Sequence, residues 1–279
     1  MIIERSFLRK LYKKRPKWSR KGQYGKLLVI GGSPIYVGAP LFVALAALRS
    51  GCDLVHVAAP QRAANIIART PDVITHSLGG NHLAERHVKD LLRISKKMDA
   101  IVIGNGLGTK KDTLSAVNIF LKKCTLPTVI DADAFKAVAK DKNLLKNRLL
   151  TPHAGEFFLL TGKSVGNELE TRKKAAKDFA SKYKCVVLLK GHIDIITDGK
   201  RMAINRTGSP EMAKGGTGDT LAGICGALLA RGVNEFDTAY AAAYINGTAG
   251  HIAAKEKGES LIASDVIEKI SEVIRETNQ

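Results

Sequence analysis

The chain has 279 residues, of which 45% are hydrophobic and 25% charged, as in an ordinary globular protein. No apolar run is long enough to cross a membrane as a helix, and the four cysteines (Cys52, Cys124, Cys185 and Cys225) are too scattered for a thiol metal site or a disulfide framework. These features exclude a helical membrane protein and a disulfide-stapled secreted domain, and they favour a cytoplasmic protein.

The formal net charge is +18, and much of it lies near the start of the chain. Residues 1–26 hold ten Lys and Arg against the single acid Glu4, so residues 1–20 form a basic N-terminal arm. Apolar residues in the arm have the spacing of one face of a short helix: Ile2, Ile3, Phe7, Leu8 and Leu11. A basic arm can bind polyanions, but no nucleic-acid motif follows it. We favour a positive field that gathers small phosphorylated substrates, with no specific nucleic acid and no membrane as partner.

Buried strands alternate with helices along the whole chain. The predicted strands are 27–32, 54–59, 100–104, 129–133, 149–153 and 186–190, followed by a hairpin through Asp198 and Gly199. A helix is expected from about residue 40 to 50, a polar helix over 168–182, and a closing amphipathic helix over 264–276 with Ser264 as its N-cap.

The repeating order of strand, loop and helix has no linker break, which predicts one α/β domain over residues 1–279. Its expected architecture is a doubly wound, mostly parallel sheet flanked by helices. Ligands bind such sheets at the carboxyl ends of the strands. The loops that follow the strands are therefore the candidate site.

The glycine-rich turn at 215–219, followed by an apolar helix, is the strongest local signal. Glycines before a helix let the backbone approach an anion, and the first amides of the helix have no partner within it. Asp219 lies at the mouth of this turn. It is either a helix cap or a base acting on a bound hydroxyl.

Further polar residues follow three other predicted strands: Asp131, Asp133, His153, Glu156 and Lys190. Each has a purely structural alternative: Asp133 as a helix cap, His153 as a satisfied histidine, and Lys190 as a solvated strand end. Together with the turn, they supply an anion site, a base, acidic groups and a lysine, which phosphoryl transfer requires. The sequence has no GxxxxGK[ST] phosphate loop, so it does not predict a Walker-type nucleotide site.

The same stretches resemble the nucleotide-dependent NAD(P)H-hydrate dehydratases. The resemblance spans roughly residues 16–250 in the family's order. It is carried by residues 21–26, 31–40, 104–108, 131–134, 150–156, 190–191 and, most specifically, 205–232. It implies the ribokinase-like fold.

The resemblance also implies a metabolite repair reaction. Water added at C6 of the nicotinamide ring of NADH or NADPH, in the S-epimer, would be removed with ADP (or ATP) as co-substrate and Mg²⁺. Phosphorylation of the C6 hydroxyl converts a poor leaving group into phosphate, which the ring nitrogen then expels.

The resemblance assigns roles to individual residues. Asp219 would be the catalytic base on the C6 hydroxyl. The hydrated dinucleotide would be lined by Ala39, Gly106 or Gly108, His153 and Asp219. The nucleotide site would comprise Lys190, Gly191, His192, Ile193, Asp194, Gly216 and Gly218. Glu156 would help to place Mg²⁺.

Two positions depart from the family pattern. Asp194 beside a nucleotide phosphate would be repulsive, so we expect it to face ribose, solvent or metal. Lys214, just before the glycine turn, is a cation compatible with a phosphate site.

Two other hypotheses stay open on the sequence. A ribokinase-like kinase of a small alcohol would use the same turn and aspartate, and a non-catalytic polyanion binder would use the basic arm. The chain has no room for the epimerase domain fused to many relatives. We therefore expect a stand-alone dehydratase with a separate epimerase partner, and the resemblance suggests a homo-tetramer.

Overall fold

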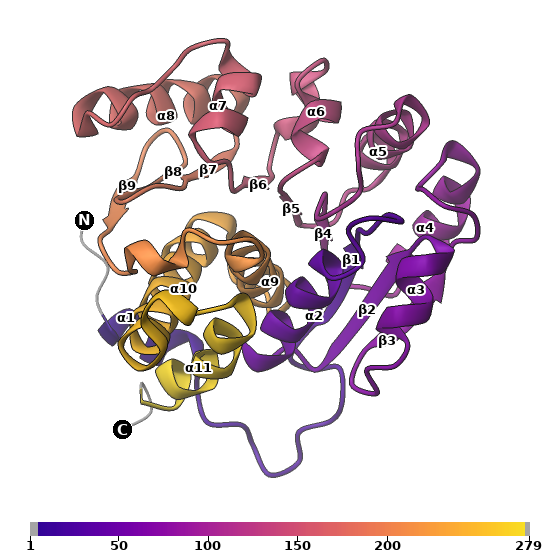
Figure 1. The fold of residues 1–279 in the computed structure, drawn as a ribbon, viewed down its shortest axis with the longest axis horizontal. Helices are drawn as coiled ribbons and strands as arrows, with labels where there is room; N and C mark the ends of the chain where they lie inside the picture. Colours follow the sequence, from indigo (N-terminus) through magenta and orange to yellow (C-terminus); the bar gives the residue numbers. More distant parts are fainter. Residues whose placement is uncertain (1–4, 277–279) are drawn as a thin grey trace.

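The computed structural model describes residues 5–276, and those residues form one nine-stranded sheet between two layers of helices (Figure 1). The strands are β1 (Lys26–Ile30), β2 (Leu54–Ala59), β3 (Ile74–Ser77), β4 (Ala100–Ile103), β5 (Thr128–Ile130), β6 (Leu149–Leu150), β7 (Val186–Leu189), β8 (Asp194–Thr197) and β9 (Met202–Asn205). The helices are α1 (Arg5–Leu11), α2 (Ala39–Arg49), α3 (Gln61–Ile67), α4 (Val88–Ser95), α5 (Lys111–Lys123), α6 (Ala134–Val138), α7 (Ala154–Thr161), α8 (Leu169–Tyr183), α9 (Thr217–Ala230), α10 (Glu235–Lys257) and α11 (Ala263–Glu276).

The strand order is β3-β2-β1-β4-β5-β6-β7-β8-β9. Neighbours from β3 to β7 are parallel, whereas the β7–β8 and β8–β9 pairs are antiparallel. This confirms the predicted mostly parallel, doubly wound sheet. The prediction contained no strand between β2 and β4, because β3 is short and only partly buried. The order reverses between β1 and β4, which is where such sheets bind ligands.

The sheet is buried on both faces because its central strands are almost wholly apolar. One face packs against α2, α9, α10 and α11, and the other against α4 to α8 (Figure 1). Small residues let α9 lie close to both α2 and the sheet. A Cβ on Gly223 would be 2.3 Å from the Val43 carbonyl oxygen, and one on Gly226 would be 2.4 Å from Val102 Cγ2.

Part of the basic N-terminal arm packs onto the domain. Leu8 is buried, and the Phe7 ring meets Tyr240 edge-on with 4.8 Å between ring centroids. Arg15 Nη1 donates to Asp53 Oδ1 at 2.7 Å. Residues 1–4, which include the expected apolar Ile2 and Ile3, lie outside the described residues. From Phe7 to Arg15 the arm is therefore attached to the body of the protein.

The closing helix was predicted with its start misplaced. It begins at Ala263, and the Asp265 carboxylate caps it by accepting from the Ile262 amide at 2.8 Å. Ser264 thus lies inside the first turn and is not the N-cap. Within residues 5–276, no helix combines the length and apolar character needed to cross a bilayer.

Candidate active site

The candidate site lies where the loops after β1 and β4 meet, at the reversal of the strand order. The Gly32 amide donates to the Asn105 carbonyl at 2.9 Å, so backbone packs on backbone. Gly104 has φ +134°, and a Cβ there would lie 1.7 Å from the carbonyl oxygen of Asp131. Only glycine allows this approach. It draws the β4 and β5 loops together at the carboxyl edge of the sheet.

The glycine turn brings Asp219 to this edge. Gly216 has φ +96° and is the N-cap of α9, which places Asp219 in the first helical turn. Thr217 Oγ1 donates to the carbonyls of Met212 and Lys214, at 2.8 and 3.0 Å, and so closes the turn. Nothing lies within 4 Å of a Cβ built on Gly215. The turn therefore presents open backbone at the positive end of a helix, which suits an anion.

One asparagine side chain joins Asp219 to Asp131. Asn105 Nδ2 donates to Asp219 Oδ1 at 2.6 Å and to Asp131 Oδ2 at 2.9 Å. The other oxygen of Asp131 accepts from Thr151 Oγ1 at 2.8 Å and from Lys190 Nζ at 3.1 Å. Asn105, Asp131 and Thr151 are buried. These contacts fix Asp219 and Lys190 relative to each other through the ends of β4, β5, β6 and β7.

Glu156 and His153 lie on the far side of Lys190. Glu156 Oε2 is 3.7 Å from Lys190 Nζ and accepts from the His153 amide at 2.8 Å. His153 Nδ1 in turn accepts from the amides of Gly155 and Glu156, at 3.0 and 3.2 Å. This reciprocal pairing caps α7 and leaves the His153 ring 60% exposed. His153 is thus both a satisfied helix cap and a side chain open to a ligand.

Burial and neighbouring charges shift the pKa values in this cluster. Burial raises the pKa of Asp219 from 3.8 to about 7, the hydrogen bond from Asn105 lowers it, and the charge of Asp131 raises it. Burial lowers the pKa of Lys190, but Asp131 and Glu156 together hold it above its usual value. Burial raises the pKa of Glu156. Near neutral pH the cluster therefore holds a charged lysine beside a carboxylate that exchanges its proton, as a general base must.

The residues expected around the dinucleotide lie in adjoining loops. A Cβ on Gly106 would be 3.0 Å from Ala39 Cβ and 2.9 Å from the Tyr36 carbonyl oxygen. The Gly108 amide donates to Asp133 Oδ2 at 2.9 Å. The Asp133 side chain therefore holds the loop after β4. It makes no hydrogen bond that would cap α6, so the helix-cap alternative does not apply.

Of the residues expected around the nucleotide, Lys190 lies beside the glycine turn, and the next three lie in the loop before β8. Lys190 and the glycine turn adjoin, because a Cβ on Gly218 would be 3.5 Å from Lys190 Nζ. Gly191 and His192 are exposed and Ile193 is half-buried. Arg172 Nη2 donates to the Lys190 carbonyl at 3.0 Å and holds this segment in place.

The two charged residues that depart from the family pattern, Asp194 and Lys214, each have partners within the protein. Asp194 faces the protein, since it accepts from the Gly191 amide and from Asn205 Nδ2, each at 3.0 Å. Burial raises the pKa of its carboxyl group. Lys214 Nζ donates to the carbonyl of Glu259, so its cation is held by the segment that follows α10.

Glu156 is the predicted contact for Mg²⁺, and its surroundings limit how the ion can bind. Within residues 5–276, no three His, Cys, Asp or Glu side chains form a group that holds a metal ion. Mg²⁺ needs only one or two carboxylates when phosphates and water complete its shell. Glu156 Oε1 lies 3.5 Å from His153 Nε2, so this oxygen still has a lone pair that could coordinate the ion. This donor set fits Mg²⁺ that arrives with a nucleotide.

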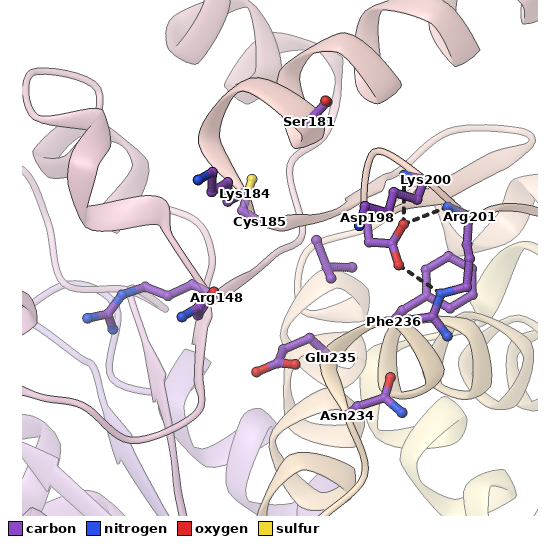
Figure 2. Close-up of a pocket in the computed structure, with 12 residues that line it drawn as sticks. Arg148, Ser181, Lys184, Cys185, Asp198, Lys200, Arg201, Asn234, Glu235 and Phe236 are labelled. Atoms are coloured by element: carbon purple, nitrogen blue, oxygen red, sulfur yellow. Dashed lines mark hydrogen bonds and ion pairs between the residues drawn. The ribbon is translucent and has the colours of Figure 1, made fainter.

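A cavity of about 500 Å³ lies elsewhere, at the amino ends of β6 and β7 beside the start of α10 (Figure 2). The Arg148 guanidinium turns away from it and donates to the carbonyls of Leu121 and Cys124, at 2.7 and 3.0 Å. Asp198 Oδ2 pairs with Arg201 Nε at 2.8 Å. Arg148 Nη1 is buried without a hydrogen-bond partner in the described structure, whereas Asp198 and Arg201 pair with each other. The cluster of Asp219, Asp131, Lys190 and Glu156 lies at the opposite edge of the sheet.

Sequence reasoning found the charged members of the site but missed Asn105 and Thr151. Thr151 directly follows β6, and Asn105 follows β4 after the single residue Gly104. Their position at the carboxyl edge was the available signal. Their role depends on Asp131, which both contact and which only the folded chain brings near Asp219.

The fold is the one seen in a solved ribokinase-like structure. A ribokinase-like superfamily protein from Enterococcus faecalis superimposes with a TM-score of 0.85, covering 99% of this chain and 95% of that one, at 24% identity. The model of the NAD(P)H-hydrate dehydratase family matches residues 27–272. The chain belongs to that family.

Three relatives illustrate the likeness. The ADP-dependent (S)-NAD(P)H-hydrate dehydratase of Cenarchaeum symbiosum is 39% identical over 98% of this chain and 96% of its own length. The bifunctional NAD(P)H-hydrate repair enzyme Nnr of Hyperthermus butylicus is 43% identical over 94% of this chain. The ADP/ATP-dependent NAD(P)H-hydrate dehydratase of Bacillus subtilis, co-crystallized with ATP and Mg²⁺, is 26% identical with a TM-score of 0.82, covering 98% and 97% of the two chains. The chain spans about half the length of the bifunctional relatives.

Proposed function

We propose that the chain catalyses the ADP-dependent dehydration of the S-epimer of hydrated NADH and NADPH. The observation that carries the proposal is the Asp219 carboxylate, held by Asn105 beside the open glycine turn with a pKa raised to about 7. A base of this pKa beside an anion site suits phosphoryl transfer to a hydroxyl. The name of the Cenarchaeum symbiosum relative supports the same reaction and donor.

The reaction follows from these groups in two stages. Asp219 takes the proton of the C6 hydroxyl, whose oxygen forms a bond to the terminal phosphorus of ADP while the bond to the AMP oxygen breaks. The ring nitrogen then donates its lone pair as the C6–oxygen bond breaks and phosphate leaves. Loss of a proton from C5 restores the dihydronicotinamide ring. The products are NADH or NADPH, AMP and phosphate.

The positive groups of the site would stabilise the transferred phosphoryl group. The amides around Gly216 and Gly218 and the positive end of α9 face the position of the anion, and Lys190 adjoins them. Mg²⁺ bound with the nucleotide would neutralise phosphate charge, and Glu156 is the carboxylate that would help to hold it. The nucleotide would be bordered by Lys190, Gly191, His192 and Ile193. Asp194 would hold the backbone of this segment by accepting the hydrogen bond from the Gly191 amide.

The dinucleotide would lie against Asp219. Ala39, Gly106 and Gly108 would border it from the loops after β1 and β4, and the exposed ring of His153 would border it from the start of α7. We also propose a cytoplasmic homo-tetramer. A separate epimerase would interconvert the two hydrates, as the repair enzymes named bifunctional suggest.

The test is recovery of the near-ultraviolet absorbance of NADH from chemically hydrated NADH, with Mg²⁺ and either ADP or ATP. We expect recovery with ADP and none without nucleotide; the ATP arm reports donor selectivity. If folded protein binds nucleotide but restores no absorbance with either donor, the proposal fails. Phosphorylation of a small alcohol would then become the leading function.

A further inference from the structure

Asn105 holds the centre of the site although it has no charge. Its side chain is fully buried, and its Nδ2 donates to two carboxylates, Asp219 at 2.6 Å and Asp131 at 2.9 Å. Its own Oδ1 is buried without a hydrogen-bond partner in the described structure. If the amide turned over, Oδ1 would face both carboxylate oxygens, and both hydrogen bonds would be lost. The two acids therefore fix its orientation.

The backbone of Asn105 is fixed as well. Its carbonyl accepts from the Gly32 amide at 2.9 Å, and the preceding Gly104 is closely packed against the carbonyl of Asp131. The side chain thus projects from a rigid junction of the β1, β4 and β5 loops. Such a support can hold a reacting group within the small tolerance that catalysis allows.

We propose that Asn105 is a positioning residue, which holds the Asp219 carboxylate toward the glycine turn and couples it to the Asp131–Lys190 pair. The inference deepens the proposed function, and its kinetic consequences rest on that function. Asn105 acts through Asp219 and not on the substrate.

The charged and titratable groups that face Asp219 determine how the loss of Asn105 acts. They are Asp131 at the end of β5, Lys190 at the end of β7 and Glu156 on α7. The two acids raise the pKa of Asp219, whereas Lys190 and the Asn105 hydrogen bond lower it. Without Asn105, the pKa of Asp219 rises, and less of the base is ionised at neutral pH.

The test compares Asn105→Ala with wild type over a range of pH. A hydrogen bond to a charged group predicts that the acid limb of the kcat profile moves up by about 1 pH unit and that kcat near neutral pH falls about fivefold or more. KM for ADP stays within about twofold, because Asn105 does not border the nucleotide. Asn118→Ala is the matched control. It removes an asparagine whose Oδ1 is also buried without a partner, but on α5.

A second measurement keeps this inference separable from the proposed function. The carboxyl group of Asp219 is titrated by carbon-13 NMR with labelled aspartate, using Asp219→Asn to assign the signal. The inference predicts a higher midpoint in Asn105→Ala than in wild type, whether or not hydrated NADH is the substrate. Should Asn105→Ala fail to fold, Asn105→Ser, whose hydroxyl is too short to bridge both acids, replaces it. Unchanged NMR midpoints and an unchanged acid limb would overturn the inference.

Discussion

At the scale of residues, Asp219 gains reactivity from a position that is unfavourable for a carboxylate. Burial raises its pKa to about 7, so the group is ready to exchange a proton near neutral pH. A free aspartate is a much weaker base. The hydrogen bond from Asn105 holds the Asp219 carboxylate in place. The charge of Asp131 helps to keep the pKa of Asp219 high.

Replacing Asp219 with Asn should remove the base and leave the anion site intact. We expect kcat for dehydration to fall by about 10²–10⁴-fold, since an amide cannot accept the hydroxyl proton. The affinity for ADP, measured by calorimetry, should stay within about twofold or rise slightly as a negative charge disappears. Near-wild-type turnover in Asp219→Asn would rule out this residue as the base.

The same variant should be more stable than wild type at alkaline pH. Asp219 titrates near 7 in the folded chain and near 3.8 when unfolded, so the folded state retains a proton that the unfolded state releases between these values. The carboxylate therefore destabilises the fold increasingly as pH rises from about 4 to about 7. We expect Asp219→Asn to raise the unfolding free energy by about 2–4 kcal/mol at about pH 8, with the gain vanishing near pH 4. Urea denaturation at both pH values measures it; a gain of equal size at both would contradict the assigned pKa.

The sequence was sufficient to predict most of the charged site but not its connections. Asp131, Lys190 and Glu156 follow parallel strands, and parallel strand ends meet at one edge. The direction of a side chain depends on tertiary partners. Asp194 and Lys214 hydrogen-bond to Asn205 and to the Glu259 carbonyl, partners in other elements that the sequence does not reveal.

At the scale of elements, α9 links the core to the chemistry. Its N-terminal turn carries Asp219, and the rest of the helix is buried against α2, α10 and the sheet. Strong apolar runs predicted β1, β2, β4 and β7 close to their observed bounds. The short helices α6 and α7 and the partly exposed β3 have weak patterns, and tertiary contacts fix them.

Gly223→Ala should disturb the packing of α9 against α2. The added Cβ would lie 2.3 Å from the Val43 carbonyl and 2.9 Å from Ala46 Cβ, so the α2 backbone must move. We expect the unfolding free energy to fall by about 1–3 kcal/mol and kcat to fall with it, because the helix shift displaces Asp219. Gly215→Ala is the stability control, since its Cβ meets nothing within 4 Å. Equal stability of the two variants in urea titrations would show that α9 does not pack tightly against α2.

At the scale of the whole molecule, the basic N-terminal segment contributes to the fold as well as to the charge. Leu8 lies in the core, and Tyr12 Oη donates to the Ser50 carbonyl at 3.3 Å. Arg231 Nη2 donates to the Leu11 carbonyl at 3.1 Å, which ties α1 to the end of α9. The exposed cations around these anchors add to a net charge of +18, which would attract phosphorylated substrates.

Leu8→Ala should therefore affect stability more than catalysis. Loss of this buried side chain should lower the unfolding free energy by about 2–3 kcal/mol, while kcat and KM of the folded enzyme stay near wild type. Lys10→Ala, an exposed position on the same helix, should change stability by less than about 0.5 kcal/mol. Loss of turnover in Leu8→Ala with unchanged stability would instead place α1 in the catalytic machinery.

In the proposed reaction, phosphorylation of the substrate hydroxyl is followed by elimination on the same enzyme. The most direct test is the product balance of a reaction with hydrated NADH, ADP and Mg²⁺, in which NADH, AMP and phosphate are quantified together. We expect one AMP and one free phosphate for each NADH recovered. Accumulation of AMP with a stable phosphorylated organic product, without NADH, would contradict it and identify the enzyme as an alcohol kinase.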